Sequence, residues 1–116
     1  MKKLFIAAIM SLSLLTTSTF AEIKMGIILG FTGPIESLTP AMAASAELAF
    51  KEASDSGSLL GGEKITPVRA DSTCVDSAAA TTAAEGLVSE GVAAIMGADC
   101  SGVTGCLLYT SPSPRD

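Results

Sequence analysis

Hydroxyl side chains and glycines gather in one stretch of the sequence, residues 92–105. An apolar run of strand length, residues 92–96, stops at Gly97 and is followed by a small polar segment that we expect to be a loop. Hydroxyls donate and accept hydrogen bonds, and glycines let backbone N–H groups approach a small anionic group closely. We therefore predict ligand contacts from four residues of this loop: Ala98, Ser101, Gly102 and Thr104. Ordinary turn chemistry is the alternative explanation for the same residues.

The residue types needed for acid–base or metal chemistry are scarce. The chain has no histidine, which removes the most common general base and most zinc sites. Asp71, Asp76 and Asp99 alone would leave a calcium or magnesium ion short of ligands. The glycine spacing and lysine of a P-loop are also absent after the first apolar run. We predict a protein that is not an enzyme, with no catalytic residue, no metal and no cofactor.

The charge balance is acidic, with seven Lys and Arg against twelve Asp and Glu and a formal net charge of -5. Basic patches with interleaved aromatic residues are absent, so we expect no nucleic-acid partner. The length of 116 residues allows one domain at most.

The first 21 residues have the features of an export signal. Lys2 and Lys3 precede an apolar run over residues 4–15, and small residues at Thr19 and Ala21 suit a signal peptidase. A membrane anchor is the alternative, but the apolar run is shorter than the roughly 18–20 residues that span a bilayer. We therefore predict a signal peptide over residues 1–21, cleaved after Ala21, and export from the cytoplasm.

Export matters for the three cysteines, because outside the cytoplasm pairs of thiols oxidise to disulfides, and these disulfides persist. Cys74 and Cys100 each follow a predicted strand, and we favour a disulfide between them. It would close a loop of about 26 residues and contribute about 3 kcal/mol to stability under the chain-entropy model. Two buried thiols are the alternative. Cys106 is not needed for this pair.

The elements that must position this site alternate between strand and helix. Strands are predicted over residues 23–31, 64–71 and 92–96, with helices from Thr39 to a stop at Gly57 and over 77–89, the second capped by Asp76. Crossovers of this length return the chain parallel, so the fold class is α/β, a doubly wound parallel β-α-β-α-β sheet. Pro67 removes a ladder donor and places its strand at an edge, which gives the strand order 2-1-3. Ligands bind such sheets beyond the carboxyl ends of the strands. We expect residues 32–34, 71–74 and 98–104 to lie there.

Side-chain spacing also predicts how each helix packs. The Thr39 hydroxyl is expected to cap the first helix, with Pro40 in its first turn and Glu47 placed to pair with Lys51 on the outer side. The apolar stripes predicted to face the sheet are Met42, Ala46, Ala49, Phe50 and Ala53 in the first helix, and Ala80, Ala84, Leu87 and Val88 in the second.

The last 11 residues, 106–116, differ in character from the rest. They read CLLYTSPSPRD, from which no helix or strand is expected. The peptide also resembles a translated transposase-type sequencing adapter residue for residue. We therefore expect a non-native, adapter-derived tail here and exclude it from the fold.

Five segments stand in this order along the chain: IKMGIILGFTGPIES, ELAFKEASDSG, LLGGEKITPVRADSTC, AAEGLVSEGV and AAIMGADCSGVTG. Taken together, they resemble the start of a type I periplasmic solute-binding protein of the branched-chain amino acid (Leu/Ile/Val) family. The resemblance implies a truncated chain in which residues 22–105 form part of the N-terminal lobe. The full-length protein would be a two-lobed monomer that hands its ligand to an ABC-type inner-membrane permease.

The resemblance also assigns roles to residues. Ser101 matches a serine that contacts the ligand carboxylate, and Cys74 and Cys100 match the family's cysteine pair. Amino acid binders often carry an aromatic residue after the first strand, where this chain has Leu38 or its neighbours. The expected function is the periplasmic substrate-binding component of an ABC transporter, for a branched-chain-like amino acid or related small carboxylate. A ligand-sensing receptor or regulator domain of the same fold, and an exported flavodoxin-like enzyme, are the alternatives.

Overall fold

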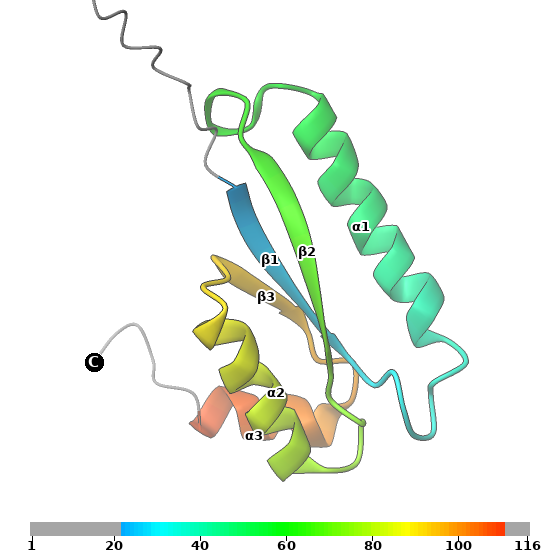
Figure 1. Ribbon diagram of the computed structural model, residues 1–116. Helices are drawn as coiled ribbons and strands as arrows, with labels where there is room; N and C mark the ends of the chain where they lie inside the picture. Colours follow the sequence, from blue (N-terminus) through cyan, green and yellow to red (C-terminus); the bar gives the residue numbers. More distant parts are fainter. Residues whose placement is uncertain (1–21, 111–116) are drawn as a thin grey trace, which may run out of the picture.

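The computed structural model describes residues 22–110, which form a three-stranded sheet with helices on both faces (Figure 1). The elements follow in the order β1 (Glu22–Leu29), α1 (Thr39–Asp55), the 3₁₀ turn η1 (Leu59–Gly61), β2 (Lys64–Asp71), α2 (Ser77–Ser89), β3 (Ala94–Gly97) and α3 (Ser101–Thr110). The predicted signal peptide, residues 1–21, lies outside the described residues, as do residues 111–116. Within the described part, the helices are too short or too polar to cross a bilayer.

The three strands are parallel, and β1 lies between β2 and β3. The predicted α/β fold and the strand order 2-1-3 are therefore confirmed. Pro67 lies in β2 opposite Met25, and it has no N–H to donate to a further strand. An edge strand tolerates this loss because one of its sides has no partner strand in the sheet.

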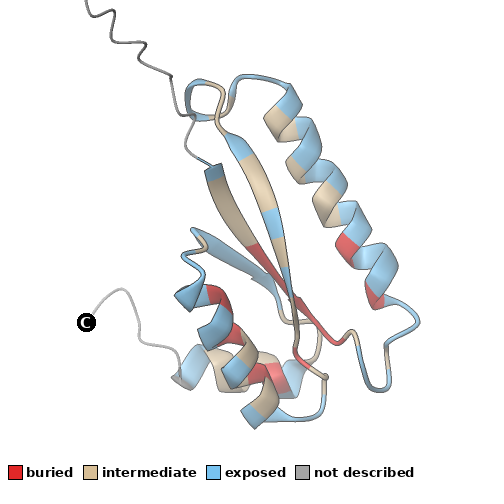
Figure 2. Cartoon of the chain, viewed as in Figure 1, coloured by how far each residue is buried: buried red, intermediate tan, exposed pale blue. Residues whose placement is uncertain are grey.

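The core is built around the second half of β1. Ile27, Ile28 and Leu29 are almost completely buried, and successive side chains of a strand point to opposite faces. Ile27 and Leu29 pack against Ala43 of α1, whereas Ile28 packs against Leu87 of α2. Figure 2 shows this buried part of β1 between the two helical layers, while β3 is exposed along its length.

The start of α1 differs from the prediction. Thr39 is the first helical residue rather than the cap; Leu38 occupies the cap position and makes no side-chain cap hydrogen bond. The Thr39 side chain is fully buried, and its hydroxyl donates to the carbonyl oxygen of Gly30 at 3.1 Å. A buried hydroxyl needs an acceptor, and the end of β1 supplies one. Pro40 does lie in the first turn, as predicted.

The start of α2 agrees with the prediction. Asp76 caps the helix, and its carboxylate accepts from the N–H groups of Ala78 and Ala79 at 2.9 and 3.0 Å. Three of the four residues predicted to face the sheet are buried: Ala80, Ala84 and Leu87.

Three residues of the predicted stripes are exposed instead. The exposed fractions of Met42 and Val88 are 44% and 67%, and Ala49 is also exposed. The buried residues of α1 are Thr39 and Ala43, and Ala46 and Phe50 pack against the same core cluster. The apolar face of a helix is wide, so the spacing of apolar residues alone does not show which side of that face contacts the sheet.

The largest difference from the prediction is α3. Residues 101–104 were expected to be loop and residues after 105 to have no regular structure, yet a helix runs from Ser101 to Thr110. Val103 is fully buried, and Leu107 packs against the cluster of Ile28 and Leu87. The burial of Val103 and the packing of Leu107 explain why this segment is helical. The artificial origin of residues 106–116 stays a prediction.

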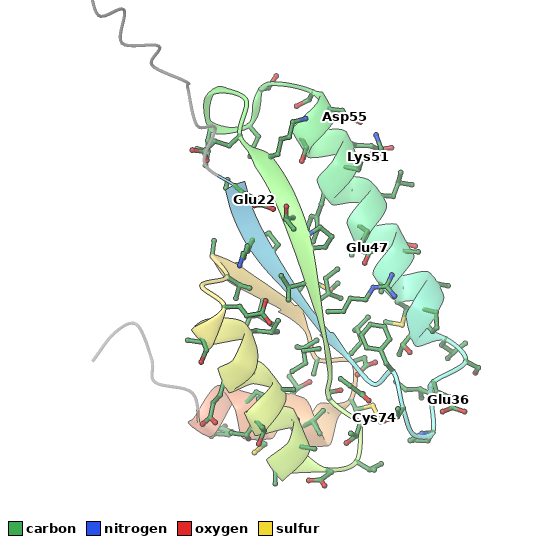
Figure 3. All side chains as sticks on the ribbon, in the orientation of Figure 1. Glu22, Glu36, Glu47, Lys51, Asp55 and Cys74 are labelled. Atoms are coloured by element: carbon green, nitrogen blue, oxygen red, sulfur yellow. A yellow bond between two sulfur atoms is a disulfide. The ribbon has the colours of Figure 1, made fainter. Side chains whose placement is uncertain are left out.

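The ion pairs of α1 also differ from the prediction. Glu47 does not pair with Lys51; it accepts two hydrogen bonds from Arg69 of β2, at 2.6 and 2.9 Å. Lys51 pairs with Asp55 one turn further along the helix (Figure 3). The Arg69 hydrogen bonds hold the pKa of Glu47 below its ordinary value. Glu47 therefore ties α1 to the edge strand.

Candidate functional site

Three loops meet beyond the carboxyl ends of the strands, as the topology predicts. Asp71, the last residue of β2, joins two of them. Its carboxylate accepts from the hydroxyl of Thr32 at 2.6 Å and from the backbone N–H groups of Thr32 and Thr73 at 3.3 and 2.8 Å. This supports the interpretation of Asp71 as a structural carboxylate rather than a metal ligand.

These contacts shift the protonation of Asp71. Partial burial raises the pKa of its carboxyl, but the hydrogen bonds from Thr32 and Thr73 lower it by more, so that the pKa lies below the ordinary 3.8. A carboxylate with a lowered pKa stabilises the fold above its unfolded-state pKa. That contribution is lost as the pH falls through the folded-state pKa.

We expect Asp71→Asn to be less stable than the wild type at neutral pH, because the amide accepts these hydrogen bonds more weakly than the charge does. The difference in the free energy of unfolding should persist down to about pH 4 and shrink below it, as the wild-type carboxyl protonates. Urea unfolding of both proteins between about pH 7 and pH 3 measures it. A difference independent of pH would contradict this role of the Asp71 charge.

The second link between the loops is covalent. Cys74, after β2, and Cys100, directly before α3, form a disulfide with their Cα atoms 5.3 Å apart, which confirms the predicted pair. Thr73 and Cys74 have φ values of 57° and 70°, a conformation that costs non-glycine residues energy. Figure 3 labels Cys74 where the loops come together. The disulfide and Asp71 together hold this unusual turn.

The third link is made by Asp99. Both of its carboxylate oxygens accept from the backbone N–H of Gly30, at 3.2 and 3.0 Å. The β3–α3 loop is thus attached to the end of β1, while Cys100 attaches it to the loop after β2. This role of Asp99 was not predicted, because nothing in the sequence around a loop carboxylate identifies a backbone partner almost seventy positions away.

Three of the predicted ligand contacts, Ser101, Gly102 and Thr104, lie in α3, and Ala98 lies in the loop before it. Ser101 and Gly102 are exposed in the first turn of the helix, which starts beside the ends of β1 and β2 (Figure 1). The first N–H groups of a helix have no acceptor inside the helix, and its positive dipole end favours an anion. The predicted contacts from Ser101 and Gly102 are therefore geometrically accessible, and they stay predictions.

Ala98 and Thr104 are engaged with each other. The Thr104 hydroxyl lies 3.0 Å from the carbonyl oxygen of Ala98 and 2.9 Å from that of Cys100, so its single hydrogen is shared between two acceptors. Both residues are half-buried. The contacts of Thr104 and Ala98 with a ligand remain predictions, whereas their contact with each other shapes the turn that leads into α3.

Within residues 22–110, the structure contains no cluster of three Cys, Asp or Glu residues that could hold a metal ion. Asp71 and Asp99 instead accept hydrogen bonds from backbone groups. The arrangement at this edge is a set of exposed donors at a helix start, held by two carboxylates and a disulfide. Such an arrangement can bind a small anionic group through hydrogen bonds.

A comparison with protein families agrees with this geometry. A comparison with curated proteins finds no significant match. The family model described as "Periplasmic binding protein" matches residues 22–108, which is most of the chain and includes every element from β1 into α3. A match of this extent shows the family, and the three-stranded parallel sheet is consistent with a lobe of such a protein. The chain therefore belongs to the periplasmic binding protein family, whose members bind small-molecule solutes.

Proposed function

We propose that this protein is the periplasmic substrate-binding component of an ABC transporter and captures a branched-chain-like amino acid or a related small carboxylate. The single observation that supports this most is the exposed first turn of α3 at the carboxyl edge of the sheet, with Ser101 and Gly102 in it. A ligand carboxylate would accept hydrogen bonds from the Ser101 hydroxyl and from the backbone N–H groups of this turn.

The rest of the proposed site follows from how its loops are held. Thr104 and Ala98 shape the turn before α3, and the disulfide keeps Cys100 beside the loop after β2. Residues 22–105 act as part of one lobe, and a second lobe closes over the bound ligand by a hinge motion. An inner-membrane permease then recognises the closed form. Binding needs no bond making or breaking in this scheme.

The test is a titration with leucine followed by amide chemical shifts, which detect weak binding. We expect the signals of Ser101 and Gly102 to move, and Ser101→Ala to weaken binding about tenfold, the effect of one hydrogen bond to a charged group. Ser77→Ala is the matched control, because Ser77 is the exposed first residue of α2, as Ser101 is of α3.

Two results would contradict the proposal. If leucine, isoleucine and valine all left the spectrum unchanged, a branched-chain amino acid would be ruled out as the ligand. If Ser101→Ala and Ser77→Ala bound leucine equally well, the first turn of α3 would be ruled out as the carboxylate site.

A further inference from the structure

The peptide groups on either side of Gly30 are held by residues from two different elements. The N–H of Gly30 donates to the carboxylate of Asp99, and its carbonyl oxygen accepts from the buried hydroxyl of Thr39 at the start of α1. Gly30 itself is buried, and a side chain there would meet the Cβ atom of Cys74 at 3.1 Å. The end of β1 is thus the point where all three loops at the carboxyl edge of the sheet are in contact.

Asp99 is the residue that connects α3 to this point. It precedes the first helical residue, Ser101, by two positions, and the intervening Cys100 is bonded to the loop after β2. The Thr104 hydroxyl closes the segment on itself through the carbonyls of Ala98 and Cys100. The segment is therefore internally held, and the Asp99 carboxylate sets its position relative to the central strand.

We propose that Asp99 is a positioning residue: by accepting from the Gly30 N–H it fixes the first turn of α3 against the end of β1 and so aims Ser101 and Gly102 at the ligand. The ligand part rests on the proposed function, whereas the placement of α3 does not. Asp99 does not touch the ligand in this scheme. A hydrogen bond to a charged acceptor is among the stronger ones in proteins, and here it joins two segments that the disulfide does not join.

The test compares three variants of the full, isotope-labelled chain without ligand. In Asp99→Ala we expect the amide hydrogen of Gly30 to exchange about tenfold faster, the effect of one lost charge-assisted hydrogen bond. The amide signals of Ser101 and Gly102 should shift as well. Asp99→Asn should restore most of both readouts, because its amide oxygen accepts from the same N–H, although more weakly than the carboxylate does. Thr39→Val is the matched control, since it removes the other hydrogen bond to Gly30 without touching the loop that carries α3.

The outcomes separate positioning from general stabilisation. Signals of Ser101 and Gly102 that stay at their wild-type positions in Asp99→Ala would overturn the proposal, as would an equal displacement in Thr39→Val. Should Asp99→Ala not fold, Asp99→Glu keeps the charge but moves the acceptor oxygens, and the same displacement of the α3 signals is then expected. Unchanged α3 signals in Asp99→Glu would overturn the proposal too.

A leucine titration of the same variants then addresses the ligand. We expect about tenfold weaker binding in Asp99→Ala and near wild-type binding in Asp99→Asn and Thr39→Val. A wild-type chain that fails to bind leucine would count against the proposed function alone, because the ligand-free spectra still decide whether Asp99 positions α3. Wild-type affinity in Asp99→Ala together with displaced signals would overturn the link between position and binding.

Discussion

Replacing both disulfide cysteines, in the Cys74→Ser/Cys100→Ser variant, is expected to lower the free energy of unfolding by about 3 kcal/mol. The cross-link closes a segment of 26 positions, and the chain-entropy model assigns that much to a loop of this size. Releasing the cross-link also lets Thr73 and Cys74 leave their positive φ values, which returns part of the loss. Urea unfolding of the variant and the oxidised wild type, at equal protein concentration, measures the difference.

The control for this experiment is Cys106→Ser. Cys106 lies in α3 with its sulfur 3.8 Å from the Thr81 hydroxyl, and it takes no part in the Cys74–Cys100 bond. We expect this variant to change stability by well under half as much, because only a half-buried sulfur is altered. Reduction of the wild type with a dithiol should reproduce the double variant. A reduced wild type as stable as the oxidised one would show that other contacts hold the two loops.

Gly33→Ala is the second change with a large expected effect. Gly33 has a φ of 95°, and a Cβ atom built there would lie 2.5 Å from the carbonyl oxygen of Thr73. The obstacle is backbone in a turn that Asp71 and the disulfide hold in place, so it cannot rotate away as a flexible side chain would. We expect about 1 kcal/mol from the positive φ and a further 1–3 kcal/mol from the overlap.

Gly61→Ala separates these two contributions. Gly61 has a similar φ of 82°, but nothing lies within 4 Å of an added Cβ atom. Its substitution should therefore cost only about 1 kcal/mol, from backbone strain alone. Thermal and urea unfolding of the two variants measure the gap. Equal losses in Gly33→Ala and Gly61→Ala would mean that the β1–α1 loop moves away from Thr73 at little cost.

The fold was predictable from the sequence because its signals are local. Each signal lies within a few residues of the element that it predicts. Examples are the apolar run around Ile28, the proline that places β2 at an edge, and the Asp76 carboxylate at the start of α2. Apolar runs, breakers and caps of this kind determine which elements form. Crossover length and chirality then leave few ways to order three parallel strands. The cysteine pair was predictable for a related reason, since both residues follow strands that end at the same edge.

The same reasoning was wrong where a segment's conformation depends on what it packs against. The polar residues after Gly97 were predicted to be a loop, but the burial of Val103 and the packing of Leu107 on the cluster of Ile28 and Leu87 make the segment helical from Ser101. Hydroxyl and glycine residues disfavour a helix only weakly, and tertiary contacts override such preferences. Of the predicted ligand contacts, Ser101 and Gly102 therefore start a helix rather than line a loop, and the first N–H groups of a helix have no acceptor inside it.

What the sequence by itself determined is the three strands, the first two helices, the parallel strand order and the edge at which the loops meet. Only the tertiary structure decided the partners: Glu47 pairs with Arg69, the Thr39 hydroxyl turns to the carbonyl of Gly30, and Asp99 holds the other side of Gly30. The physical reason is that a hydrogen bond or ion pair selects its partner by distance in space. Side chains far apart in the chain acquire a defined distance only once strands and helices are packed.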